Sequence, residues 1–104
     1  MGIILLNENV ILKLKKLTFK SDEMQLFFDD TNGINDNFSK LIEIIAKGNV
    51  LFEREKETIA SDLVSFSPKE NKIIITGNVK VLKGKNVGLS SDFLEINLKN
   101  EFLN

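Results

Sequence analysis

The sequence contains no cysteine, no histidine, no tryptophan and no tyrosine, and it has a single proline. The absence of cysteine excludes disulfide bonds and thiolate metal sites. The absence of histidine removes the commonest general base of enzymes and the commonest metal ligand. The composition therefore predicts a protein that is not an enzyme and that holds no metal ion or cofactor. An apolar fraction of 42% with so little proline is typical of a folded chain.

The sequence also lacks a large excess of one sign of charge and any long apolar run. The 14 basic and 15 acidic residues nearly cancel, so the composition predicts no nucleic-acid partner. Only four apolar residues, Ile3 to Leu6, lie together before Asn7. This run is shorter than the apolar stretch of a secretory signal and than the roughly 20 residues of a membrane-spanning helix. The residues alone leave two locations open: the cytoplasm, or a compartment reached through a segment that this sequence does not include.

The sequence does contain an internal repeat. Residues 46–52 (AKGNVLF) and 75–81 (ITGNVKV) are nearly alike, and their glycines are 29 positions apart. A Ser-Asp pair follows each copy, at residues 61–62 and 91–92. A fixed period of this length is typical of architectures built from stacked supersecondary units, none of which can bury its apolar face alone.

A third and weaker copy of the repeat lies upstream. Asn9 precedes Asp22 by the same 13 residues that separate Asn49 from Asp62, but Glu8 stands where the other copies have glycine. The sequence therefore predicts one domain over residues 1–104, made of three repeats and a polar insert. The repeats cover approximately residues 7–28, 42–70 and 73–100, and the insert covers residues 29–37.

Apolar and polar residues alternate along each repeat, which is typical of strands with one buried face. The phase of this alternation flips at the Ser-Asp pairs 21–22, 61–62 and 91–92, as it does at a β-bulge or a sharp bend. Ser and Asp side chains can bond the backbone groups that a bend leaves unpaired, so we interpret these pairs as structural corners. The pattern predicts an all-β domain of six to eight short antiparallel strands. Residues 38–45 could also form a short helix, but their alignment with the second copy favours a strand from about Leu41.

The parity of the alternation predicts which residues face an interior between two facing sheets. The candidate binding residues on this inner face are Val50, Phe52, Ile59, Phe66, Ile73, Ile75, Val79, Val81, Leu89, Leu94 and Ile96. Val10, Leu12, Leu26, Phe28 and Val64 are expected on the same side, and Ile11, Leu51 and Ile74 on the outside. By themselves, such residues would pack against one another as a closed core, which is the usual role of an alternating apolar face.

The phrase Gly-Asn-Val, followed by an alternating strand, a polar turn and Ile/Leu-x-Ser-Asp, resembles the OstA-like repeat of lipopolysaccharide-transport proteins. That family includes LptA, LptC and the N-terminal domain of LptD. The resemblance covers residues 42–98 well and residues 9–28 more weakly. It implies a repeat-built open jelly roll, or β-taco, with two facing sheets and a V-shaped cross-section.

The same resemblance implies a function in the periplasm. In that family the acyl chains of lipopolysaccharide lie in the apolar groove, which would make the inner-face residues above lipid-binding. Domains of the family join end to end through their edge strands, so the resemblance predicts other OstA-like domains as partners and a homo-oligomer.

Two other functions compete with lipid carriage. The first is a structural or assembly module that self-associates through its edge strands without lipid cargo. The second is an enzyme or a calcium site that uses Asp29 with Asp30, or Asp36, although their spacing fits no known ligand loop. Some lysines could meet lipid phosphates near the rim of a groove, or could simply be surface charges that keep strand edges from aggregating. These lysines are Lys13, Lys15, Lys16, Lys80, Lys83 and Lys85.

Overall fold

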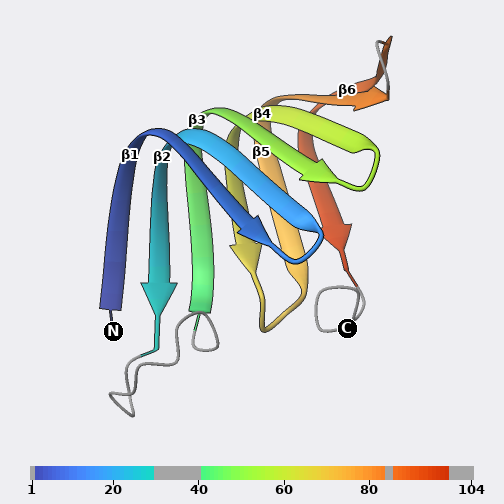
Figure 1. The fold of residues 1–104 in the computed structure, drawn as a ribbon. Coiled ribbons are helices and arrows are strands. Elements are labelled where there is room, and N and C mark those ends of the chain that lie inside the picture. Colours follow the sequence, from blue (N-terminus) through green and yellow to red (C-terminus); the bar gives the residue numbers. More distant parts are fainter. Residues whose placement is uncertain (1, 30–40, 84–85, 99–104) are drawn as a thin grey trace.

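The computed structural model describes residues 2–29, 41–83 and 86–98, which form one open sheet of six antiparallel strands (Figure 1). The strands are β1 (Gly2–Leu14), β2 (Leu17–Phe28), β3 (Leu41–Arg54), β4 (Glu57–Ser67), β5 (Lys72–Lys83) and β6 (Asn86–Asn97). Each strand pairs with the next one in the chain, so the sheet consists of three consecutive hairpins. The predicted all-β class is confirmed, and so is the strand that begins at Leu41.

The six strands lie within the predicted range of six to eight, but they are longer and more continuous than the short strands that the sequence pattern predicts. They contain 11 to 14 residues each, and all six belong to a single sheet in place of the two facing sheets that parity predicts. The alternation changes phase in the middle of each strand, which in the sequence resembles a boundary between two strands. The backbone ladder continues through that position, because a β-bulge bends a strand without ending it.

A β-bulge lies in the middle of every hairpin. In the second hairpin, Gly48 and Asn49 together lie opposite the single residue Asp62. Both have left-handed backbones, with φ of 82° and 47°. The other hairpins repeat this arrangement, with Gly77-Asn78 opposite Asp92 and Glu8-Asn9 opposite Asp22. The three copies of the sequence repeat therefore correspond to three copies of one bulge.

The Asp of the first and of the second bulge reaches the bulge of the following hairpin. Asn49 Nδ2 donates a hydrogen bond to Asp22 Oδ2 at 2.9 Å, and the equivalent bond from Asn78 to Asp62 is also 2.9 Å. The Asp22 carboxylate lies so close to Gly48 that a Cβ there would be 2.9 Å from Asp22 Oδ2; at the equivalent glycine of the third hairpin this distance is 2.8 Å. Glycine is needed here for its positive φ and for its lack of a side chain. We call this contact between consecutive hairpins the Asp–Asn clamp.

The serine of each Ser-Asp pair closes the bulge locally. Ser21 Oγ donates a hydrogen bond to the Glu23 carbonyl at 2.7 Å, and Ser91 Oγ bonds the Phe93 carbonyl at 2.9 Å. The equivalent bond from Ser61 is 3.4 Å long. The interpretation of the Ser-Asp pairs as structural corners is therefore confirmed. The other half of each corner is Glu8-Asn9, Gly48-Asn49 or Gly77-Asn78.

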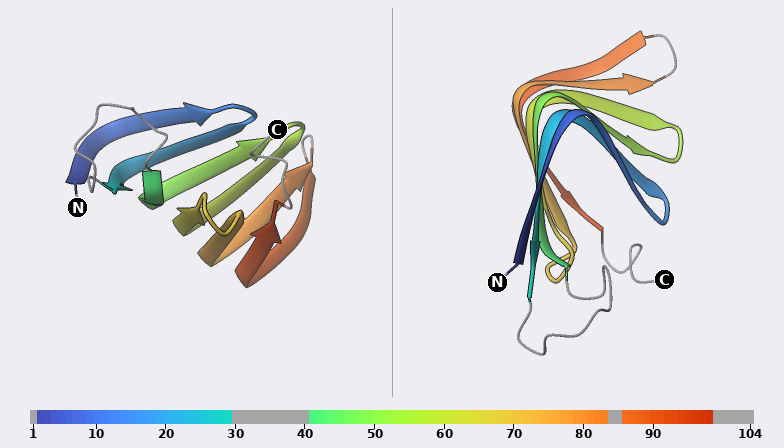
Figure 2. Two further views of the ribbon diagram at one scale, coloured as in Figure 1. Left: turned by 90° about the horizontal axis from the view of Figure 1, so that it is seen from below. Right: turned by 60° about the vertical axis from the view of Figure 1, so that its left-hand side comes forward.

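The row of bulges folds the sheet over on itself, so that it has two arms (Figure 2, right). The lower arm contains residues 2–7, 23–28, 41–47, 63–67, 72–76 and 93–97, and the upper arm contains residues 10–14, 17–21, 50–54, 57–61, 79–83 and 86–91. Every strand runs through both arms. The buried apolar side chains of the two arms form one cluster between them.

The turns at the strand ends agree with the sequence where the structure describes them. A turn at residues 55–56 joins β3 to β4, and one at residues 68–71 joins β4 to β5, where Asn71 N donates to the Pro68 carbonyl at 3.2 Å. Most of the predicted polar insert (residues 30–37) lies outside the described residues, as do residues 84–85 between β5 and β6.

The clamp predicts a large difference between two glycine substitutions. We expect Gly48→Ala to lower the free energy of unfolding by about 2 kcal/mol, because the new Cβ meets Asp22 and the left-handed backbone is unfavourable for alanine. Gly2→Ala is the matched control, since the nearest atom to its new Cβ is 3.9 Å away, and it should change stability by less than about 0.5 kcal/mol. Urea denaturation of both variants measures the difference. Equal losses would contradict the role assigned to the clamp.

Candidate functional site

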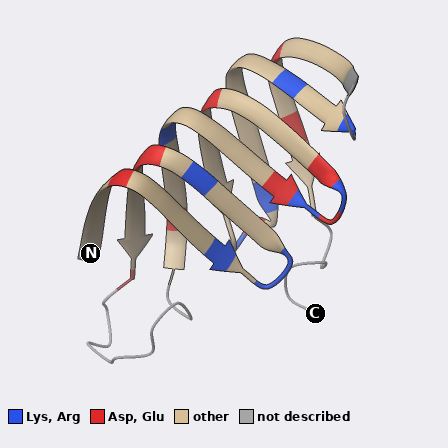
Figure 3. Cartoon of the chain, turned by 45° about the horizontal axis from the view of Figure 1, so that its top comes forward, with Lys and Arg blue, Asp and Glu red and all other residues tan. Residues whose placement is uncertain are grey.

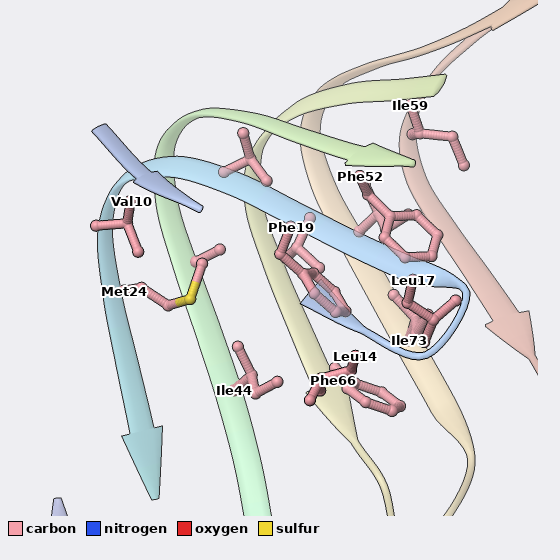
Figure 4. Packing of buried hydrophobic residues seen from close by; sticks show 14 of the residues in the cluster. Val10, Leu14, Leu17, Phe19, Met24, Ile44, Phe52, Ile59, Phe66 and Ile73 are labelled. Atoms are coloured by element: carbon pink, nitrogen blue, oxygen red, sulfur yellow. The ribbon is translucent and has the colours of Figure 1, made fainter. Parts of the chain in front are cut away.

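Three phenylalanine rings fill the middle of the space between the arms. Phe19 and Phe52 come from the upper arm, and Phe66 comes from the lower arm (Figure 4). The ring centroids of Phe19 and Phe52 are 5.1 Å apart, and those of Phe19 and Phe66 are 5.6 Å apart. All three side chains are fully buried. Aromatic pairs at these distances add packing energy to the burial of their area, so the rings hold the two arms together.

The strand register places all eleven predicted binding residues on the inner face, but it divides them into two groups. The first group belongs to the closed core, with no more than 1% of each residue exposed, and consists of Val50, Phe52, Phe66, Ile73, Ile75 and Val79. These residues pack against one another across the arms. The middle of the interior is thus a packed core in this structure.

The second group lines a hollow at the β6 end of the interior. It consists of Ile59, Val81, Leu89, Leu94 and Ile96, and the hollow has a volume of about 450 Å³. Leu94 and Ile96 are only partly buried, and Leu89 is 51% exposed. The volume falls within the range of small-molecule sites. β6 is the last described strand of the sheet, and no described strand covers the apolar interior beyond it.

Charged side chains border this apolar hollow. Arg54, Glu57 and Lys83 from the upper arm also line it, and Arg54 Nη2 lies 3.2 Å from Glu57 Oε1. The exposed Lys83 adds a second cation on the β5 side. The hollow thus combines an apolar floor with a polar rim that carries both signs of charge.

No protein-family model, curated protein or solved structure matches this chain. The function must therefore be inferred from the chain's own geometry and repeat.

The lysines that could meet lipid phosphates at a groove rim do not gather around the hollow. Lys13, Lys15 and Lys16 lie at the β1–β2 turn, at the opposite end of the sheet, and Lys80 is exposed on the outer face. Lys83 alone among the described members of that set borders the hollow, and Lys85 lies outside the described residues. The charges along the outer side of the sheet include both signs in Figure 3, as is ordinary for a solvated surface.

Two further searches concern metal ligands and membrane-spanning helices among the described residues. No three acidic side chains among them gather where they could hold a metal ion. Asp29 is exposed at the end of the second strand, while Asp30 and Asp36 lie outside the described residues. Within the same residues, no helix has the length and hydropathy needed to cross a membrane.

Phe19 is one of the buried residues that the alternation did not place on the inner face, although it contacts both other rings. A signal for it was present in the repeat: Phe19 precedes Ser21 by two positions, as Ile59 precedes Ser61 and Leu89 precedes Ser91. Alignment of the weak first copy with the two stronger ones would have placed it inside. Buried residues also missing from the expected inner set include Leu14, Leu17, Met24, Leu41, Ile44, Ala46 and Leu98.

The two groups of inner residues should respond differently to truncation. We expect Phe52→Ala to lower the free energy of unfolding by about 3–5 kcal/mol, because it leaves a cavity in the closed core. Leu89→Ala should cost about 1 kcal/mol or less, since half of that side chain already faces solvent. Chemical denaturation followed by circular dichroism tests both values. Similar losses for the two variants would mean that the β6 end is as tightly packed as the middle.

Proposed function

We propose that this protein is a non-enzymatic module of lipopolysaccharide transport in the periplasm, which shields acyl chains in the apolar space between its arms. The observation that carries the proposal is the hollow at β6. Its apolar lining of Ile59, Val81, Leu89, Leu94 and Ile96 is continuous with the inner face of the whole sheet. An acyl chain in contact with this lining would gain about 0.8 kcal/mol for each buried methylene.

The proposal assigns the chain to the OstA-like repeat family. Two Gly-Asn bulges and one Glu-Asn bulge, each opposite the Asp of a Ser-Asp pair, support this assignment, because they bend every strand at the same level and so create two arms with a shared interior. In this proposal the folded sheet is the open jelly roll, or β-taco, of that family. The polar rim at Arg54 and Lys83 would face the phosphate groups of the lipid while the acyl chains lie inside.

The proposal also assigns partners. The sheet ends at β1 and β6, and inner-face residues are incompletely covered at both ends: Ile4 is 45% exposed and Leu89 is 51% exposed. An edge strand with unpaired backbone groups is a template for a further strand. Addition of other OstA-like domains, or of further copies of this chain, would pair the edge and lengthen the apolar interior.

A structural module that assembles through its edges without cargo is the second candidate. The closed middle of the interior favours it, since Phe19, Phe52 and Phe66 leave no exposed surface there. The two functions differ in whether lipid touches the hollow.

Photocrosslinking distinguishes these two functions. A photoreactive amino acid at Leu89 should form an adduct with lipopolysaccharide, because this side chain lies at the open end of the apolar interior. The same amino acid at Ile11 is the matched control, since Ile11 is 59% exposed but lies on the outer face. Mass spectrometry of the purified adducts should show labelling at position 89 and at least about tenfold less at position 11. No adduct at position 89, or equal labelling at both, would rule out carriage in the hollow.

A further inference from the structure

One edge of the sheet presents half of an Asp–Asn clamp. Within the chain, Asp22 and Asp62 each receive the Asn side chain of the following hairpin. Asp92 is the third Asp of this series and is exposed on β6. In the part of the chain that the structure describes, no strand pairs with the outer side of β6.

The inner-face apolar side chains of β6 also lack neighbours on one side among the described strands. Between hairpins, inner-face residues pair across the strands, as Leu26 pairs with Ile44 and Phe66 pairs with Ile73. Leu94 on β6 pairs with β5 only, and it remains partly exposed. The Asp92 carboxylate and the inner-face apolar side chains of β6 would therefore both be covered by the same kind of strand. That strand would carry Gly-Asn opposite Asp92 and apolar residues at alternate positions.

A second copy of this chain would offer β1 as that strand. If the register between hairpins is continued, Asn9 of the second copy lies opposite Asp92, and Leu6 lies beside Leu94. The inner-face apolar side chains of the two edges would therefore cover one another, since Leu6, like Leu94, is only partly buried. The match fails at one position, because Glu8 of the second copy would take the place of the clamp glycine.

Glu8 opposes that junction in two ways. Its backbone already has the clamp conformation, with φ of 68°, so its Cβ would point where a Cβ on Gly48 or Gly77 points. At those glycines a Cβ would be 2.9 Å and 2.8 Å from a carboxylate oxygen of the clamp Asp. The Glu8 carboxylate would in addition bring a second negative charge next to Asp92, and like charges placed across an interface disfavour that pairing.

We propose that the β6 edge docks a strand from a different protein domain, one that bears Gly-Asn opposite Asp92, and that Glu8 is the residue that discourages a second copy of this chain from taking that place. The inference rests on the end-to-end joining of the proposed function and narrows its partner. The two edges of the sheet then have different roles: β6 pairs with a strand of the next domain, and β1 pairs poorly with the β6 of another copy.

The test is to restore the glycine. Wild-type protein should remain a monomer in size-exclusion chromatography with light scattering, whereas Glu8→Gly should form chains at a concentration at least about tenfold lower than any wild-type association. Glu55→Gly is the matched control: Glu55 is exposed and has φ of 53°, but it lies in the β3–β4 turn. It removes the same charge and the same backbone strain away from the edges, so it should leave the protein monomeric. Chains in the wild type at the same concentration, or in Glu55→Gly, would overturn the proposal, as would a monomeric Glu8→Gly.

A mixing experiment tests which edge is used. In the double variant Glu8→Gly/Asp92→Ala, the β1 edge carries the clamp glycine and the β6 edge lacks the clamp carboxylate. In the wild type, the β6 edge keeps Asp92 and the β1 edge keeps the unfavourable Glu8. Each should be monomeric alone, and the mixture should form a one-to-one dimer. A mixture that stays monomeric, or a double variant that forms chains by itself, would show that the Asp92 junction is not the contact.

These readouts are independent of lipid. If Glu8→Gly forms chains but Leu89 gives no lipopolysaccharide adduct, the edge assignment stands and carriage fails. If the adduct forms and Glu8→Gly stays monomeric, carriage stands and the partner assignment fails.

Discussion

The contact on which this fold depends is the approach of an Asp carboxylate to the Gly-Asn bulge of the next hairpin. At Gly48 and Gly77 the carboxylate occupies the space that any side chain would need, and the Asn amide bonds it at 2.9 Å. The bulge bends its own strand, but the clamp sets the position of that bend relative to the neighbouring hairpin. Without this alignment the bends would not form one row, and the sheet could not fold into two arms.

The fold of the sheet decides where apolar surface is buried. A flat antiparallel sheet of six strands would expose its whole apolar face, whereas the bent sheet covers one half of that face with the other. The phenylalanine rings close the middle, where each residue has strands on both sides as well as the opposite arm. At β6 a strand has a neighbour on one side only, and the result is the hollow that Leu89, Leu94 and Ile96 line. The closed core and the open end are two consequences of the same geometry.

Much of the candidate site could be predicted from the sequence, because parity is a local property of a strand. All eleven residues chosen by alternation lie on the inner face, and the three phase flips lie at the bulges. The degree of burial could not be predicted in this way. Alternation places both Phe52 and Leu89 on the inner face, yet Phe52 is fully buried and Leu89 is half exposed. The reason is that burial depends on residues from the opposite arm and from the adjacent strand. Phe19 lies in the weakest copy of the repeat and was missed, as were Ile44 and Ala46 of the second copy.

The sequence by itself determined the all-β class, the inner and outer faces, and the positions of the bends, because side-chain alternation and bulge-forming residues act over a few neighbours. Only the tertiary structure decided that six strands form one folded sheet, that the Asp of one hairpin holds the Asn of the next, and that the interior is closed at its middle and uncovered at β6. Those features depend on contacts between residues 16 to 27 positions apart and on the packing of two arms, and no pattern within a single strand contains them.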